Sequence, residues 1–375
     1  MSKGAFMDGS KFSCGICIDD MWTYAGVLPP KSIIIPHLLS VRLPQGPFSM
    51  NFGKNPSTRG RARLSTVSLT EPSDAQKTEL TKLFSKNLAR HLRQNRVRFV
   101  RCWFQWNLFQ PRIYSGKDQA YEFPLDNFVQ TMNDEGIDII AVIGNGYDRF
   151  LPAGLNINNL NEYLPRLSEA SREIVSHYRG KISMWQLENE PDWWLEHFAS
   201  DWRRGGIWFD RDAVDRILGE LHGTVLEEDP GALTMINLEA DTSGAFSRSY
   251  SRFCDVLGLD FYPNYTHADP INVSKLKDKV SEAKKSSGKQ IMITETGYPS
   301  GPKLFGFDQK RQSEYIRAIC EEVYSIDSVG ALGIWRLSDP YWLSFPFQEN
   351  SFGLINRQGM PKDAWFVYLD QVKRS

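Results

Sequence analysis

From residue 74 onward, short apolar segments alternate with longer segments in which apolar residues recur at helical spacing. The alternation is typical of βα units, which build a parallel sheet. Several apolar segments are continuous, as expected for strands buried on both faces. Seven strands are predicted after residue 74, at 97–104, 137–143, 182–187, 233–238, 256–261, 291–294 and 331–335. An eighth strand is expected near the N-terminus, at 12–18.

Eight parallel strands, each followed by a helix, form a (β/α)8 TIM barrel, and this is the α/β fold that we predict. The chain has 375 residues, so residues 1–375 fit a single barrel domain with insertions. Residues 20–72 are rich in Pro, Gly and Ser and are expected to form a long insertion after the first strand. The main alternative is an open doubly wound sheet. That fold normally carries a G-x-G-x-x-G phosphate turn, which the sequence lacks.

Charge and cysteine content exclude several classes of function. The formal net charge is −1, which predicts neither a nucleic-acid partner nor a membrane partner. The five cysteines are odd in number and scattered, so we expect reduced structural thiols. The lone Cys14-x-x-Cys17 has no second ligand pair, and neither a metal nor a cofactor is expected. Residues 1–10 lack an apolar signal segment, which predicts a cytoplasmic protein, or a secreted one if a leader has been removed.

Two carboxylates stand where a barrel places its reacting groups, at the carboxyl ends of strands. Glu190 follows the predicted fourth strand, and Glu295 ends the seventh. A glycosidase needs two carboxyl groups beside one glycosidic bond, about 5–5.5 Å apart when the enzyme retains configuration. A single Glu at a strand end is most often a capping or ion-paired residue. Two of them at these positions favour catalysis.

The segments around both residues resemble motifs of clan A of the glycoside hydrolases, the 4/7 superfamily. Asn189-Glu190-Pro191 is similar to the clan's motif after strand four, and Thr294-Glu295-Thr296-Gly297-Tyr298 is similar to its motif at strand seven. The resemblance covers roughly residues 75–370 and does not identify an individual family. It implies that Glu190 is the general acid/base and Glu295 the nucleophile.

The same resemblance implies roles for other residues. Arg101 would support the nucleophile, with Arg98 as the alternative if the strand register differs. Tyr262 would hydrogen-bond the nucleophile, and Trp335 would form the floor of the sugar subsite. Further substrate-binding candidates lie near these strand ends: Asn145, Asn189, Trp193, Trp194 and Tyr298. The two tryptophans could equally pack their loop onto itself. Asp260 is expected to orient a neighbouring group.

The predicted function is hydrolysis of a β-linked glycoside or oligosaccharide with retention, through a glycosyl-enzyme intermediate. One alternative is a transglycosylase or biosynthetic enzyme that uses the same two Glu residues with an acceptor other than water. A second alternative is a non-catalytic carbohydrate-binding barrel. The sequence leaves open the sugar, its linkage, endo or exo cleavage, and the oligomeric state.

Overall fold

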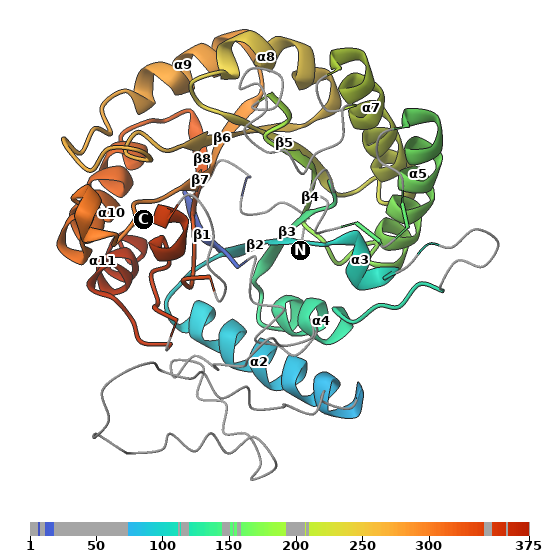
Figure 1. Ribbon diagram of the computed structural model, residues 1–375, viewed down its shortest axis with the longest axis horizontal. Helices are drawn as coiled ribbons and strands as arrows, with labels where there is room; N and C mark the ends of the chain where they lie inside the picture. The colour runs from blue at the N-terminus through green and yellow to red at the C-terminus, as the bar shows by residue number, and fades with distance from the viewer. Residues whose placement is uncertain are drawn as a thin grey trace, which may run out of the picture.

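The computed structural model is a closed barrel of parallel strands surrounded by helices (Figure 1). Residues 20–72, the predicted insertion, lie outside the part of the chain that the structure describes. The described residues are 7, 12–18, 74–111, 113, 120–144, 151–152, 154–155, 159–192, 207, 210–340, 347–357 and 359–374.

Each strand pairs in parallel with its neighbours in sequence, and the first pairs with the eighth. The predicted (β/α)8 barrel is therefore confirmed. Because parallel strands need a crossover between them, the described helices return the chain along the outside of the barrel. The strands are β1 (Ser13–Cys17), β2 (Phe99–Trp103), β3 (Asp138–Val142), β4 (Met184–Asn189), β5 (Leu233–Glu239), β6 (Val256–Phe261), β7 (Gln290–Thr296) and β8 (Val329–Ile334).

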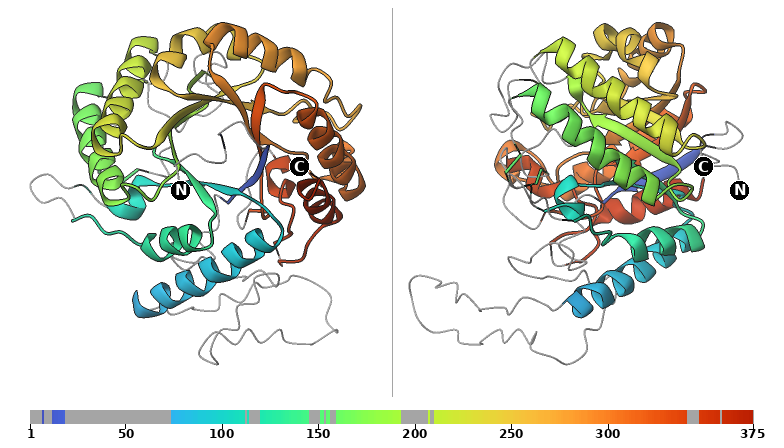
Figure 2. Two further views of the ribbon diagram at one scale, coloured as in Figure 1. Left: turned by 180° about the vertical axis from the view of Figure 1, so that it is seen from behind. Right: turned by 90° about the vertical axis from the view of Figure 1, so that its right-hand side faces the viewer.

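The helices form the outer layer, as the two views of Figure 2 show from behind and from the side. Side-chain oxygens of Asn159, Asp210 and Asp308 cap α5, α7 and α10 by accepting backbone N–H bonds in the first turn. No described helix has the length and apolar character that a membrane crossing requires. The helices are α2 (Asp74–Gln94), α3 (Trp106–Phe109), α4 (Asp126–Asp134), α5 (Leu160–His177), α7 (Arg211–Glu228), α8 (Ser243–Tyr250), α9 (Leu276–Ser287), α10 (Gln309–Tyr324) and α11 (Asp363–Val372), with 3₁₀ turns η5 (Ser251–Phe253), η6 (Lys303–Phe305) and η7 (Phe347–Ser351).

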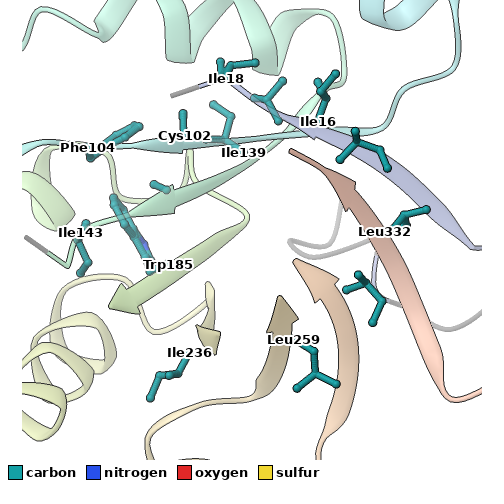
Figure 3. Close-up of a cluster of buried hydrophobic side chains, with 14 of the residues drawn as sticks. Ile16, Ile18, Cys102, Phe104, Ile139, Ile143, Trp185, Ile236, Leu259 and Leu332 are labelled. Carbon is teal, nitrogen blue, oxygen red and sulfur yellow. The ribbon is translucent and has the colours of Figure 1, made fainter. Parts of the chain in front are cut away.

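The main hydrophobic core lies between the strands and the helices. It collects the outward-facing side chains of the strands, which alternate with inward-facing ones because a strand has a period of two. Figure 3 shows part of this core, including Cys102 and Phe104 at β2 and Trp185 of β4. The alternation leaves Arg101, between the outward-facing positions of β2, to face the barrel interior.

The barrel interior is apolar at the amino ends of the strands and polar above them. Side chains at the amino ends form a closed cluster that fills the bottom of the barrel, and they are Phe99, Ile140, Met184, Met235, Val256, Met292 and Ala331, with Met7 packed beneath. Two residues further along their strands lie Arg101, Gln186 and Asn237, all 0% exposed. These polar side chains therefore lie above an apolar cluster that excludes water.

Two strands contain an irregularity just before their predicted catalytic residue. In β4, Gln186 pairs with Met235 but Asn189 pairs with Asn237, so β4 carries one extra residue. In β7, the partner of Asp260 is Glu295, again one residue later than regular pairing would place it. Bulges of this kind redirect the side chains that follow them. Here they turn Asn189 and Glu295 toward the barrel axis.

Candidate active site

Arg101 organises the site from the inner face of β2. Its Nη1 lies 2.6 Å from Oε1 of Glu295. Its Nη2 donates to Oδ1 of Asn189 at 2.7 Å, and its Nε donates to Oε1 of Gln186 at 2.6 Å. The guanidinium, fully buried, thus links β2, β4 and β7. Arg98, the alternative position, is exposed.

Glu295 is held as a carboxylate by two neighbours. One oxygen forms the ion pair with Arg101, and Oε2 accepts a hydrogen bond from the Tyr262 hydroxyl at 2.8 Å. Charge-assisted bonds of this type stabilise the negative charge. Removal from water and the charge of Glu295 raise the pKa of Tyr262 well above its ordinary value, so the phenol remains a donor. Tyr262, the residue expected to hydrogen-bond the nucleophile, thus contacts Glu295.

Glu190 follows β4 in an unusual backbone conformation. Its φ is 44°, in the left-handed region that non-glycine residues rarely adopt. The side chain of Asn237 accepts the Glu190 backbone N–H at 3.1 Å, and Asn189 Nδ2 lies 3.5 Å from Glu190 Oε2. Such conformations cost about 1–3 kcal/mol and concentrate at functional sites, where the surroundings enforce them.

The electrostatic surroundings of Glu190 oppose its ionisation. Burial raises its pKa well above the ordinary value, and the negative charge of Glu295 raises it further. Asp192 and Glu239 add to this effect. Glu190 is therefore suited to carry a proton, whereas Glu295 is paired with a cation. Pairs of titratable groups with opposite surroundings mark acid and base roles.

Two buried amides connect these groups, and sequence reasoning missed both. Gln186 Nε2 donates to Asn237 Oδ1 at 2.7 Å. Asn237 Nδ2 contacts Asn189 Oδ1 at 2.9 Å and Asp260 Oδ2 at 2.5 Å. The available signal was an amide side chain between apolar residues within each strand. Because buried polar groups are costly without partners, such residues indicate an internal network.

The remaining predicted residues differ in where they lie relative to Glu190 and Glu295. Trp335 follows β8, is partly exposed, and donates its backbone N–H to Thr296 O at 2.8 Å. Its peptide bond to Arg336 is cis. Tyr298 is buried and its hydroxyl donates to Ala268 O, so the structure does not bring it beside the carboxylate pair. Three predicted residues lie outside the described part of the chain: Asn145, Trp193 and Trp194.

The described cysteines and acidic residues show no metal-binding arrangement. All five cysteines are buried thiols. Among the described residues, no group of three or more His, Cys, Asp or Glu side chains is placed to hold a metal ion. Cys17 lies 3.8 Å from Arg101 Nη1, where it packs against the guanidinium.

Comparisons with known proteins point to enzymes that act on carbohydrates. No protein-family model matches the chain. Endo-1,4-beta-xylanase B of Thermotoga neapolitana is 26% identical over 227 residues, which cover 56% of this chain and 62% of the xylanase. The matched region is thus less than two thirds of that relative.

Solved structures share the fold. A GH5_18 protein from Streptomyces cattleya, solved with Manb1-4GlcNAc, has a TM-score of 0.64 and 17% identity, covering 78% of this chain and 75% of that one. Xylanase 10B from Thermotoga petrophila, solved with xylobiose, has a TM-score of 0.56 and 17% identity, covering 76% and 88%. Together the matches support the resemblance to clan A glycoside hydrolases, without assigning an individual family.

Proposed function

We propose that this protein hydrolyses β-linked glycosides with retention of configuration, with Glu190 as acid/base and Glu295 as nucleophile. The observation that carries the proposal is the contrast between the two carboxyl groups. Glu295 is paired with Arg101 and Tyr262, while burial and neighbouring negative charge raise the pKa of Glu190. One group is thus prepared to attack and the other to donate a proton.

In the first half-reaction, Glu190 protonates the glycosidic oxygen while Glu295 attacks the anomeric carbon. The bond to the leaving group breaks, and a glycosyl ester forms on Glu295. In the second half-reaction, Glu190 accepts a proton from water as the water oxygen attacks the same carbon. The carboxylate of Glu295 leaves, and the product keeps the configuration of the substrate.

The related proteins support a β-linked substrate. The relative by sequence is named for β-1,4 cleavage of xylan, and the Streptomyces structure holds a β1-4 disaccharide. Two structural neighbours thus share the barrel, and each was solved with a carbohydrate ligand of its own. We assign the present chain a β-glycoside substrate class, and leave the sugar to measurement.

The test uses Glu190→Gln and Glu295→Gln with a panel of aryl β-glycosides. Each variant should lose about 10²–10⁴-fold or more in kcat/KM, since each lacks an essential proton donor or nucleophile. Azide should rescue Glu190→Ala with a β-glycosyl azide as product. The same nucleophile should give an α-glycosyl azide with Glu295→Ala. Proton NMR of the first-formed anomer should report retention in the wild type.

The matched control is Glu314→Gln, which removes a carboxylate from the exposed face of α10, 3.7 Å from Lys310. It should keep wild-type kcat/KM. Full activity in either site variant would overturn the assignment. Inverted product would leave the residues in place but exclude the double displacement.

A further inference from the structure

Asp260 is a third carboxyl group at the site, and its surroundings do not fit an ionised side chain. It lies in β6, opposite Glu295 in the strand register, and is 0% exposed. One oxygen, Oδ2, accepts from Asn237 Nδ2 at 2.5 Å. The other, Oδ1, is buried and meets no hydrogen-bond donor among the described residues.

The neighbour of that carboxyl group is Glu190. The side chain of Asn237 contacts both residues, since its Oδ1 accepts the Glu190 backbone N–H at 3.1 Å and its Nδ2 donates to Asp260 Oδ2. Ionised carboxylates only accept hydrogen bonds, so a contact between the two groups requires a proton on at least one of them. Once Glu190 has given its proton to the leaving group, that proton must be on Asp260. Arg101 lies near Asp260, but its charge is already engaged by Glu295. Two carboxyl groups that share a site without a cation of their own do not both ionise.

We propose, building on the proposed function, that Asp260 remains a protonated carboxylic acid and donates its hydrogen bond to Glu190. Asp260 is then a positioning residue, which acts on the substrate through Glu190. Burial and the charge of Glu295 raise the pKa of Asp260 well above its ordinary value, which agrees with this state. The assignment gives Oδ1 a hydrogen-bond role and leaves Oδ2 to accept from Asn237.

The role of Asp260 follows from the order of proton transfers. When Glu190 protonates the leaving oxygen, it becomes a buried carboxylate, and the ester on Glu295 removes the neighbouring negative charge. The O–H of Asp260 then stabilises the Glu190 carboxylate until water returns a proton to it. Asp260 keeps its own proton throughout, so the proton count of the two half-reactions is unchanged.

The protonation state can be measured without turnover. The infrared absorption of protonated carboxyl groups should be compared at neutral pH between Glu190→Gln and the double variant Glu190→Gln/Asp260→Asn. The single variant should retain a band that the double variant lacks. Glu190 is absent from both proteins, and Asp192 contributes equally to both. Identical spectra would overturn the proposal.

The high-pH limb of the pH profile of kcat/KM tests whether Asp260 acts through Glu190. Asp260→Asn, which keeps a donor, should leave the limb unmoved. Asp260→Ala should move it to higher pH by about one unit and slow deglycosylation about tenfold, because a charge-assisted bond to the Glu190 carboxylate is lost. A shift to lower pH in either variant would mean that Asp260 is ionised. An unmoved limb in active Asp260→Ala would mean a structural role only.

The groups that surround the pair stay the same in both variants. They come from the other strands and their ends: Arg101 of β2, Asp192 after β4, Glu239 of β5 and Glu295 of β7. Asp241→Asn, an exposed carboxylate paired with Lys279, serves as the control and should leave the limb unmoved. If no glycoside is turned over, the proposed function fails while the infrared comparison still decides the state of Asp260. A negative infrared result with active wild type would overturn this inference alone.

Discussion

Glu190 and Glu295 carry the same functional group, but the charges beside them have opposite signs. The difference arises from contacts that cross the barrel, since Arg101 comes from β2 and Tyr262 follows β6. Neither residue is near Glu295 in sequence. Burial away from water strengthens these interactions. The proposed acid/base and nucleophile roles thus depend on a few residues that closure of the barrel brings together.

Tyr262→Phe should lower kcat/KM by about 10–100-fold with little change in thermal stability. The hydroxyl donates to Glu295 Oε2, and a hydrogen bond to a charged group is worth about 1.5–3 kcal/mol, or one to two factors of ten in rate. Steady-state kinetics on an aryl glycoside and a melting curve measure both effects. Tyr324→Phe in α10, which removes a hydroxyl that donates to Gln371 O, is the control. Equal losses in both variants would contradict a role at the site.

The residues of the candidate site were predictable to different degrees. Glu190, Glu295 and Tyr262 stand at strand ends and Arg101 stands inside its strand, all within a motif order, and the structure brings these four together. Gln186 and Asn237 lie inside their strands, where polarity alone does not tell which groups they contact. The partners of Asp260 likewise depend on strand register, which no local pattern reveals.

At the scale of elements, the strands were predicted well because continuous apolar runs bounded by polar residues mark them clearly. Predicted bounds of 256–261 coincide with β6, and 233–238 differs from β5 by one residue. The bulges of β4 and β7 were not predicted. By strict alternation, Glu188 would face inward and Asn189 outward, yet the extra residue in β4 places Asn189 against Arg101.

Asp192 connects the end of β4 to the end of β5. Its carboxyl group accepts from the Glu239 backbone N–H at 3.1 Å and from the Thr242 hydroxyl. The side chain is 0% exposed. Burial raises its pKa from 3.8 to about 8. The link between the two strand ends therefore has a pH dependence of its own.

Asp192→Asn should gain stability relative to the wild type as pH rises. Between about pH 4 and 8 the folded wild type holds the Asp192 proton more tightly than the unfolded chain, so its stability falls with rising pH. The amide that replaces the carboxyl group in the variant does not titrate. The gap between the free energies of unfolding, obtained from urea denaturation at pH 5, 7 and 9, should change by at most about 1.4 kcal/mol per pH unit. Asp241→Asn should show a constant gap. A constant gap for Asp192→Asn as well would contradict the raised pKa.

At the scale of the whole molecule, a buried ion pair joins the segment before α11 to the mouth of the barrel. Lys362 Nζ lies 2.7 Å from Asp339 Oδ1 after β8, 2.9 Å from Ser300 Oγ after β7, and 3.2 Å from Ser351 O. The Lys362 side chain is 3% exposed. The two connections that follow β7 and β8 thus meet at one ammonium group.

Lys362→Met should destabilise the fold by about 3–5 kcal/mol, because removal of one partner leaves a buried charge without compensation. The double variant Lys362→Met/Asp339→Asn should recover part of that loss, since neither charge remains. Denaturation midpoints measure both. Lys310→Met, at a side chain that is 85% exposed, should change stability by less than about 0.5 kcal/mol. A single variant as stable as the wild type would contradict a structural role for the pair.

The whole fold was predictable because its repeating unit is local. Each strand and its following helix can be recognised from periodicity alone, and eight such units leave the barrel as the consistent arrangement. The contacts between βα units were not predictable. The contacts of Lys362, for example, depend on how loops far apart in the sequence pack against one another.

The pairing of β1 with β8 has a consequence for how the protein is made. The hydroxyl of Tyr368 in α11 donates to Gly15 O at 2.8 Å, across 353 positions of sequence. The ribosome adds about 5–20 residues per second, so Tyr368 is added roughly 20–70 s after Gly15. One edge of β1 therefore stays unpaired during most of synthesis, when exposed strand edges invite association with other chains. Shielding of this edge until the last strand arrives would protect the nascent chain from such association.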